Sequence, residues 1–332
     1  MSDLPVEWVK IDGIPLLVKK RISRLPLTPG DYLASFVQGN QTSYEISNKN
    51  INILIINALN ADDHRQIYGK NLYHNVRLIS NNWEHIKYVE AKSKSEYIDS
   101  INKIKPNVLI HFGHGAYNRW KGSDKFERMH GALIINKEEV LSSSEIDSIS
   151  DFPKIVILGA CTTEVPQGPN YNMANTFLSN GALSVIGTFI PVNADYTADF
   201  ITNLIHHFYL CLSNTSKEII ENWSDIIYIV RIKMYIEEPV YCLSNDYKKG
   251  KLKTKVQAFD PINKFINYCK SNNVSVDDSL KNRDDIYSEV FKSNTELYEA
   301  FKSIYLSNSI TPYISFYTSL GAPEKIYISR DY

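Results

Sequence analysis

Asn107-Val-Leu-Ile-His-Phe112 and Lys154-Ile-Val-Ile-Leu-Gly-Ala160 are the two stretches that decide the fold. Each is a short, almost uninterrupted apolar run, which is typical of a strand buried on both faces of a parallel sheet. Residues 51–57 and 183–190 repeat this pattern. Segments with helical spacing separate the runs, and strands that alternate with helices predict a mostly parallel sheet with helices on both faces. We therefore expect an α/β fold.

Composition narrows the class of protein further. The chain has 332 residues and 43% hydrophobic content, enough for one large domain or a domain with an extension. Its 36 Lys and Arg nearly balance 37 Asp and Glu, so we expect no nucleic-acid partner, because such binding relies on a basic surface. No apolar run reaches the roughly 18 residues of a membrane span, and the N-terminus lacks the pattern of a secretory signal. We expect a cytoplasmic protein without membrane association.

The chain has four cysteines, and they are not equivalent. They are Cys161, Cys211, Cys242 and Cys269. None forms a C-x-x-C pair, which argues against a zinc knuckle and a thioredoxin-type motif. Isolated cysteines without a secretory signal indicate a reducing compartment. Each is then a core residue or a nucleophile. Cys161 alone follows a buried strand and a pair of small residues, so we interpret the other three as core or incidental thiols.

A reactive side chain follows each of the two predicted strands. His114 lies between Gly113 and Gly115 after the first apolar run, and Cys161 follows the second run, 47 positions later. The carboxyl ends of parallel strands share one edge of the sheet, where reactive groups gather. An imidazole beside a thiol favours the thiolate and can protonate a leaving amine. This pair predicts nucleophilic catalysis at the sheet edge.

A metal site is the alternative use of the same residues. His111, His114 and Cys161 are all possible zinc ligands. No motif supplies a fourth ligand, and we interpret His111, inside the strand, as a packed and hydrogen-bonded histidine. We expect no metal and no cofactor.

The residues around these strands resemble the CHAT domain. This bacterial family of caspase-like peptidases is related to caspases, separases and gingipains, and in caspases the histidine precedes the cysteine by roughly 50 residues. The resemblance covers roughly residues 50–240. It rests on His111-Phe-Gly-His-Gly115, Gly131-Ala-Leu133, the Gly-Ala-Cys-Thr of Ile155–Thr162, and Gly181-Ala-Leu-Ser-Val-Ile-Gly-Thr-Phe-Ile-Pro-Val192.

The resemblance implies a caspase-like three-layer sandwich and a cysteine endopeptidase. Cys161 would be the nucleophile and His114 the general base and acid, with the backbone N–H groups of Gly115 and Cys161 forming the oxyanion hole. The resemblance requires no third catalytic residue, and none is predicted. It also implies a partner protein as substrate, such as a pore-forming protein, an activating sensor protein, and a role in bacterial defence or cell death.

The resemblance also divides the chain. Residues 1–50 are predicted to be an N-terminal extension, 51–240 the peptidase core, and 241–332 a mostly helical extension whose last part, 312–329, packs back on the core. Within that part, residues 314–318 and 325–329 predict a final strand pair around Gly321-Ala-Pro323.

Two other functions are consistent with an α/β chain of this kind. The extension after residue 240 leaves room for a catalytically silent adaptor that binds partner proteins, although the intact Cys–His pair argues against it. A nucleotide-binding domain is disfavoured, because the sequence has neither of the usual phosphate-binding glycine motifs.

The sequence gives little indication of which substrate side chains the site binds. Glu164, just after the nucleophile, and Asp195 are candidates for binding a basic side chain of the substrate. Asp195 has an alternative interpretation as the N-cap of a helix. The charged and aromatic segment 116–130 predicts a loop, which would be a lid over the site, a substrate rim or an ordinary surface insertion.

Overall fold

The computed structural model describes residues 6–24, 43–80, 83–121, 127–135, 139–161, 163, 172–213, 220–306 and 312–329. The chain divides into two units. The first contains Arg21–Val230 and Phe316–Tyr332, together with Met1–Leu4, and the second contains Pro5–Lys20 and Arg231–Ser315. Within the described residues, no helix combines the length and the apolar character that a membrane crossing needs.

A six-stranded sheet forms the centre of the first unit. Its spatial order is β12-β11-β10-β6-β4-β5. The first five strands along the chain are parallel, and only β12 runs antiparallel to its neighbour β11. The strands are β4 (Ile53–Asn57), β5 (Ile86–Glu90), β6 (Val108–Phe112), β10 (Ile155–Gly159), β11 (Ser184–Thr188) and β12 (Tyr317–Gly321). The predicted mostly parallel sheet is confirmed.

The apolar runs are strands because both of their faces are covered. Every residue of β4, β6, β10, β11 and β12 is buried. On one face, alternate residues such as Leu109 and Val156 join a core with Tyr97 and Phe177. Burying an aliphatic side chain of this kind contributes about 1.5–3 kcal/mol.

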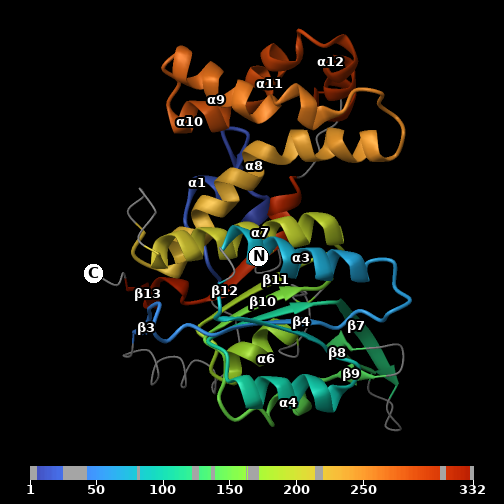
Figure 1. The fold of residues 1–332 in the computed structure, drawn as a ribbon, viewed down its shortest axis with the longest axis vertical. Coiled ribbons are helices and arrows are strands. Elements are labelled where there is room, and N and C mark those ends of the chain that lie inside the picture. Colours follow the sequence, from blue (N-terminus) through green and yellow to red (C-terminus); the bar gives the residue numbers. More distant parts are fainter. Residues whose placement is uncertain are drawn as a thin grey trace. The chain divides into compact units, whose positions relative to one another are not determined.

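Helices lie on both sides of this sheet (Figure 1). On one side are α3 (Gln66–Ile79) and α7 (Ala194–Leu212), and on the other are α4 (Lys94–Ile104) and α6 (Met173–Ser179). The short α5 (Ser143–Ile146) packs into the same core as α4 and α6. Several begin at a capping residue that the sequence supplies: Ser93 caps α4, and Asn172 caps α6. The structure therefore confirms the predicted sandwich of helix, sheet and helix layers.

The strand order reverses between β4 and β6. The chain passes from β4 through α3 to β5 on one side, and then through α4 to β6 on the other side of β4. Helices that cover opposite faces leave a crevice beyond the carboxyl ends of the two strands at such a point. Phe112 at the end of β6 is in register with both Asn57 of β4 and Gly159 of β10. Three strands thus end side by side.

The segment predicted as a loop over 116–130 is part of a hairpin, so that prediction is wrong. Strands β7 (His114–Lys121) and β8 (Glu127–Ile134) pair antiparallel, and β8 continues to β9 (Val140–Leu141). Residues 122–126 lie outside the described part of the chain. Tyr117 and Trp120 are aromatic residues of the kind that is enriched in strands. The charged residues of this segment favour a loop by composition, but they are compatible with a paired ribbon.

The predicted final strand pair is also wrong, because its two strands pair with other partners. β12 pairs with β11, and β13 (Ile326–Ile328) runs parallel to β3 (Tyr44–Ile46). Gly321 separates them at a φ of +88°, and a Cβ atom there would lie 2.2 Å from the carbonyl oxygen of Leu183. Only glycine combines this φ with so close an approach, and the chain continues from β12 to β13 without a hairpin between them.

The second unit is mostly helical, as expected for the C-terminal region. It begins with η1 (Val6–Trp8), a small hairpin of β1 (Lys10–Ile11) and β2 (Ile14–Pro15), and α1 (Leu16–Lys19). The later elements are the end of α8 (Trp223–Lys248), η2 (Val256–Phe259), α9 (Pro261–Ser271), α10 (Val276–Lys281), α11 (Arg283–Phe291), α12 (Thr295–Phe301), the π-helical turn η3 (Lys302–Leu306) and η4 (Tyr313–Phe316), which ends at the boundary of the unit. Phe265, Tyr287, Phe291 and Phe301 form an aromatic core there.

A buried carboxyl lies within this helical unit. Glu238 of α8 is 1% exposed and accepts a hydrogen bond of 2.6 Å from the backbone N–H of Tyr313. The Arg283 guanidinium lies 3.8 Å away and stacks over the ring of Tyr235. Burial raises the pKa of Glu238 to about 7, although Arg283 and the Tyr313 N–H oppose the rise.

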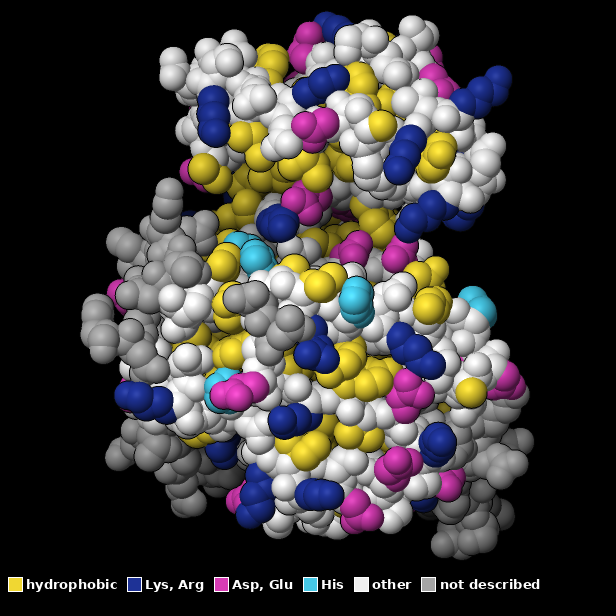
Figure 2. All heavy atoms as spheres, in the orientation of Figure 1, with side chains coloured by type: hydrophobic (Ala, Val, Ile, Leu, Met, Phe, Trp, Pro, Cys, Tyr) yellow, Lys and Arg dark blue, Asp and Glu magenta, His cyan; other side chains and the backbone are white. Residues whose placement is uncertain are grey.

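Charges of both signs are mixed on the surface. Figure 2 shows Lys and Arg side chains interspersed with Asp and Glu over the described part of the face that it draws. This agrees with the near balance of charges in the sequence.

Candidate active site

Cys161 lies on a short bend directly after β10, where it is half-buried. Hydrogen bonds fix the backbone on both sides of it. The hydroxyl of Thr188, at the end of β11, donates to the carbonyl of Ala160 at 2.7 Å. The backbone N–H of Thr188 donates to Thr163 Oγ1 at 3.0 Å. The end of β11 therefore holds the residues around Cys161 in place.

The thiol of Cys161 points toward the segment that leads into α7. Its Sγ atom lies 3.9 Å from the carbonyl oxygen of Val192, a weak hydrogen bond. The next residue, Asn193, caps α7 by accepting a hydrogen bond of 2.9 Å from the N–H of Asp195. The thiol thus lies at the end of β10, between the end of β11 and the segment that leads into α7.

His114 reaches the same edge from the neighbouring strand. The N–H of Gly113 bonds to the carbonyl of Gly159 at 3.2 Å, which ties the turn after β6 to the end of β10. A Cβ atom on Gly115 would lie 2.1 Å from the carbonyl oxygen of Cys161. Only glycine permits that approach. The structure therefore places Gly115, the residue after His114, directly against the backbone of Cys161. The roles of His114 and Cys161 stay predictions.

Asp63 is a further residue at this edge, and it is absent from the sequence-based site. It lies in the loop between β4 and α3, and its Oδ2 atom is 2.7 Å from Nε2 of His114. The carboxylate also accepts hydrogen bonds from the backbone N–H and the guanidinium of Arg65. Burial favours the protonated acid, but the bonds from His114 and Arg65 outweigh it and hold the pKa of Asp63 well below its usual range.

The position of Asp63 in the sequence is similar to that of the two predicted site residues. Asp63 follows the apolar run 51–57, as His114 and Cys161 follow theirs. The loop from the end of that run to Asp63 is longer, so sequence spacing did not place the carboxylate near the histidine.

His111 has a different environment from His114. It is fully buried within β6, with its ring centroid 5.7 Å from that of Tyr97. Burial, with a smaller contribution from His114, lowers the pKa of His111 to about 3. The imidazole is therefore neutral at physiological pH. Across the described residues, no three His, Cys, Asp or Glu side chains are grouped as a metal would require.

Of the two residues predicted to bind substrate, the structure describes only Asp195. Glu164 lies outside the described residues. Asp195 is the second residue of α7 and is half-buried. The alternative interpretation of Asp195 as the helix N-cap is wrong, because Asn193 occupies that position. Asp195 remains a prediction for substrate binding.

The other three thiols lie in helices. Cys211 is buried in α7, and Cys242 and Cys269 are half-buried in α8 and α9. Burial raises the pKa of Cys242 to about 11, against a smaller lowering by Tyr305, and it also raises the pKa of Cys269. Both remain protonated and weakly nucleophilic near neutral pH.

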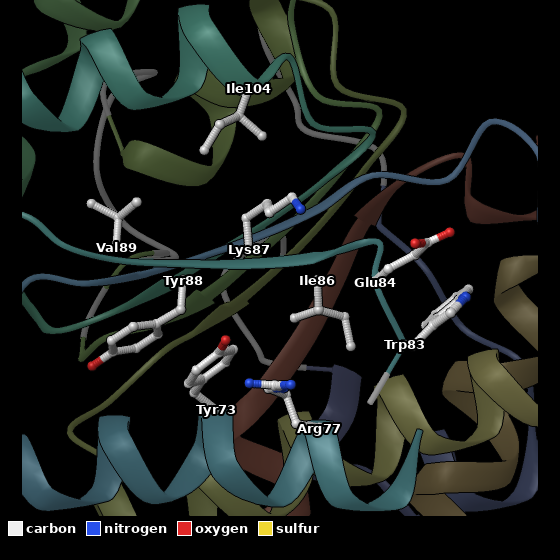
Figure 3. A pocket seen from close by; sticks show the side chains of 9 residues that line it. All are labelled: Tyr73, Arg77, Trp83, Glu84, Ile86, Lys87, Tyr88, Val89 and Ile104. Carbon is white, nitrogen blue, oxygen red and sulfur yellow. The ribbon is translucent and has the colours of Figure 1, made fainter. Parts of the chain in front are cut away.

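A cavity of about 530 Å³ lies along the edge strand β5. Figure 3 shows its side chains, among them Tyr73 and Tyr88, whose rings stack at 4.6 Å, and Arg77 beside Tyr73. Trp83 and Glu84, which precede β5, line its other end. Two strands separate β5 from β10, so this cavity is not part of the Cys161 site.

The comparison with protein families finds a match that includes the candidate site. The family model described as the CHAT domain matches residues 77–216, which include His114 and Cys161. This part of the chain is similar to the CHAT domain. The match begins inside α3 and ends just after α7, so Asp63 precedes the matched part of the CHAT domain. No curated protein sequence matches the chain significantly.

Two solved structures are similar to the whole chain at low identity. One is the crystal structure of the Arg-specific cysteine proteinase gingipain R, with 10% identity and a TM-score of 0.43, covering 90% of this chain and 53% of the other. The second is the complex of Porphyromonas gingivalis RgpB pro- and mature domains, with 12% identity and a TM-score of 0.40, covering 88% and 53%. The chain spans about half the length of these proteins.

Proposed function

We propose that this chain is a cysteine endopeptidase that cleaves a partner protein, with Cys161 as nucleophile and His114 as general base and acid. One observation carries the proposal. Cys161 and His114 follow adjacent parallel strands in the part similar to the CHAT domain, and Gly115 packs directly against the Cys161 carbonyl. A nucleophile and a base that meet at a strand edge are what acyl transfer needs.

The chemistry has two halves. The Cys161 thiol gives its proton to His114, and the sulfur attacks the carbonyl carbon of the substrate. The tetrahedral intermediate then collapses to a thioester as His114 returns the proton to the leaving amine, and water hydrolyses the thioester with His114 as base. The backbone N–H groups of Gly115 and Cys161 are the proposed donors to the oxyanion, and one such donor is worth about 10²–10³ in rate.

The biological setting belongs to the proposal as well. The similarity to the CHAT domain supports a regulated peptidase in a bacterial defence or cell-death pathway, with a sensor protein that activates it. Asp195 and Glu164 are the proposed contacts for a basic substrate side chain.

The test compares cleavage sites in a cell lysate. Wild-type protein and Cys161→Ala are each expressed, and new protein N-termini are identified by mass spectrometry. We expect new termini with wild-type protein only. Cys269→Ala, which removes a half-buried thiol elsewhere, should cleave like wild type. Identical termini from wild type and Cys161→Ala, or none from either, would contradict the proposed function.

A further inference from the structure

The contact between Asp63 and His114 links two strands on opposite sides of the point where the strand order reverses. Asp63 follows β4 and His114 follows β6. Their side chains meet over the carboxyl ends of these strands, with 2.7 Å between Oδ2 and Nε2. The histidine side chain is 29% exposed and the carboxylate 14%. A hydrogen bond this short between partly buried groups fixes the orientation of the imidazole.

The loop holds the Asp63 carboxylate independently of His114. The backbone N–H of Arg65 donates to Oδ1 at 2.8 Å, and Nε of Arg65 donates to the same oxygen at 3.0 Å. Nη2 of Arg65 lies 3.3 Å from Oδ2. The exposed ring of His64 lies 3.8 Å from Oδ1. The carboxylate is therefore set in place by residues of its own loop.

The protonation of this pair follows from the donors and acceptors. An ionised carboxylate accepts hydrogen bonds and cannot donate them. Because Asp63 is ionised across the neutral range, Nε2 of His114 must carry the hydrogen. In the neutral imidazole, the lone pair then lies on Nδ1.

We infer that Asp63 is a positioning residue for His114, which holds Nε2–H and so makes Nδ1 the nitrogen that accepts the proton of the Cys161 thiol. The inference rests on the proposed function. As the S–H bond breaks, its electron pair stays on sulfur and the proton bonds to Nδ1. The resulting imidazolium carries its charge next to the Asp63 carboxylate, which stabilises the thiolate–imidazolium pair.

Alkylation of Cys161 tests this role without a substrate. Rates of modification by iodoacetamide are measured by peptide mass spectrometry for wild type, Asp63→Asn and Asp62→Asn across a pH series. Asn keeps an oxygen for the Arg65 N–H but removes the charge. We expect Asp63→Asn to react about tenfold more slowly near neutral pH, equivalent to about one pKa unit of lost ion-pair stabilisation. It should match wild type at alkaline pH, where solvent deprotonates the thiol. Asp62→Asn should behave like wild type throughout.

Two outcomes would overturn the inference. One is an unchanged rate for Asp63→Asn near neutral pH, and the other is an equal loss at every pH, which a purely structural role predicts. A second measurement needs no variant: nitrogen NMR of ¹⁵N-histidine-labelled wild-type protein should show His114 with the proton on Nε2. A neutral His114 protonated on Nδ1 would refute the assignment.

The same variants separate this inference from the proposed function. If Cys161→Ala abolishes cleavage while Asp63→Asn keeps full kcat, the result supports the peptidase proposal and contradicts the positioning role of Asp63. If Cys161→Ala cleaves like wild type, the peptidase proposal itself fails. With both correct, Asp63→Asn lowers kcat and leaves KM unchanged, because Asp63 acts through His114 and not on the substrate.

Discussion

The hydroxyl of Thr188, the last residue of β11, donates a hydrogen bond of 2.7 Å to the carbonyl of Ala160, the residue before Cys161. Both groups are buried. This bond connects the end of β11 to the residue before Cys161 and so holds the bend that presents the thiol.

Thr188→Val should therefore destabilise the protein and disturb the thiol. Valine has the same shape but leaves the Ala160 carbonyl without its donor, which costs about 1–3 kcal/mol. Urea denaturation gives the free energy of unfolding, and Cys161 alkylation reports the site. Thr202→Val is the control, because its buried Oγ1 has no hydrogen-bond partner within the described chain, so its stability should stay constant or rise. Equal effects from the two variants would contradict the role of Thr188.

Gly115→Ala should affect both stability and reactivity. The added Cβ would lie 2.1 Å from the Cys161 carbonyl oxygen, so the backbone must move. Overpacking of this kind costs about 1–3 kcal/mol. We expect a lower free energy of unfolding and slower Cys161 alkylation. The comparison is Gly113→Ala, whose Cβ would meet side chains of His111 and Ala58 at 2.9 Å or more and should cost less. The reverse order would argue against the close approach of Gly115.

The Asp63 carboxylate should add stability only above acidic pH. Its folded pKa lies below the ordinary value of 3.8, so the folded state binds the proton less readily than the unfolded chain. The stabilisation is fully present above that value and is lost as the pH falls through the folded pKa. Asp63→Asn should therefore be less stable than wild type at neutral pH, and the two should converge in acid. Denaturant titrations over a pH series check this, and a constant difference down to strong acid would speak against it.

Glu238 should affect the pH dependence of stability in the opposite direction to Asp63. Burial raises its pKa to about 7 from 4.5, so the folded state binds the proton more tightly than the unfolded chain. Its contribution is favourable below the unfolded value and is lost as the pH rises through the folded pKa. Glu238→Gln keeps an acceptor for the Tyr313 N–H and should remove this part of the pH dependence between about pH 4.5 and 7. Unfolding curves of both proteins over that range measure it; parallel curves would refute the assignment.

Local patterns predicted much of the fold. The apolar runs 51–57, 107–112 and 154–160 contain the strands β4, β6 and β10, and every residue of these strands is buried, as a continuous apolar run predicts. The sequence did not predict the hairpin of β7 and β8 or the partners of β12 and β13. Strand pairing depends on residues that are far apart in the chain. A short strand such as β13 has the same sequence character whichever neighbour it joins.

The sequence by itself determined which side chains follow the buried strands, and thereby His114 and Cys161, since a strand end is a local property. Only the tertiary structure decided which strand ends meet. The reversal of strand order between β4 and β6 brings Asp63 to His114, 51 residues apart in the chain. The orientation of the imidazole is a consequence of that contact, because one carboxylate at 2.7 Å determines which nitrogen carries the proton.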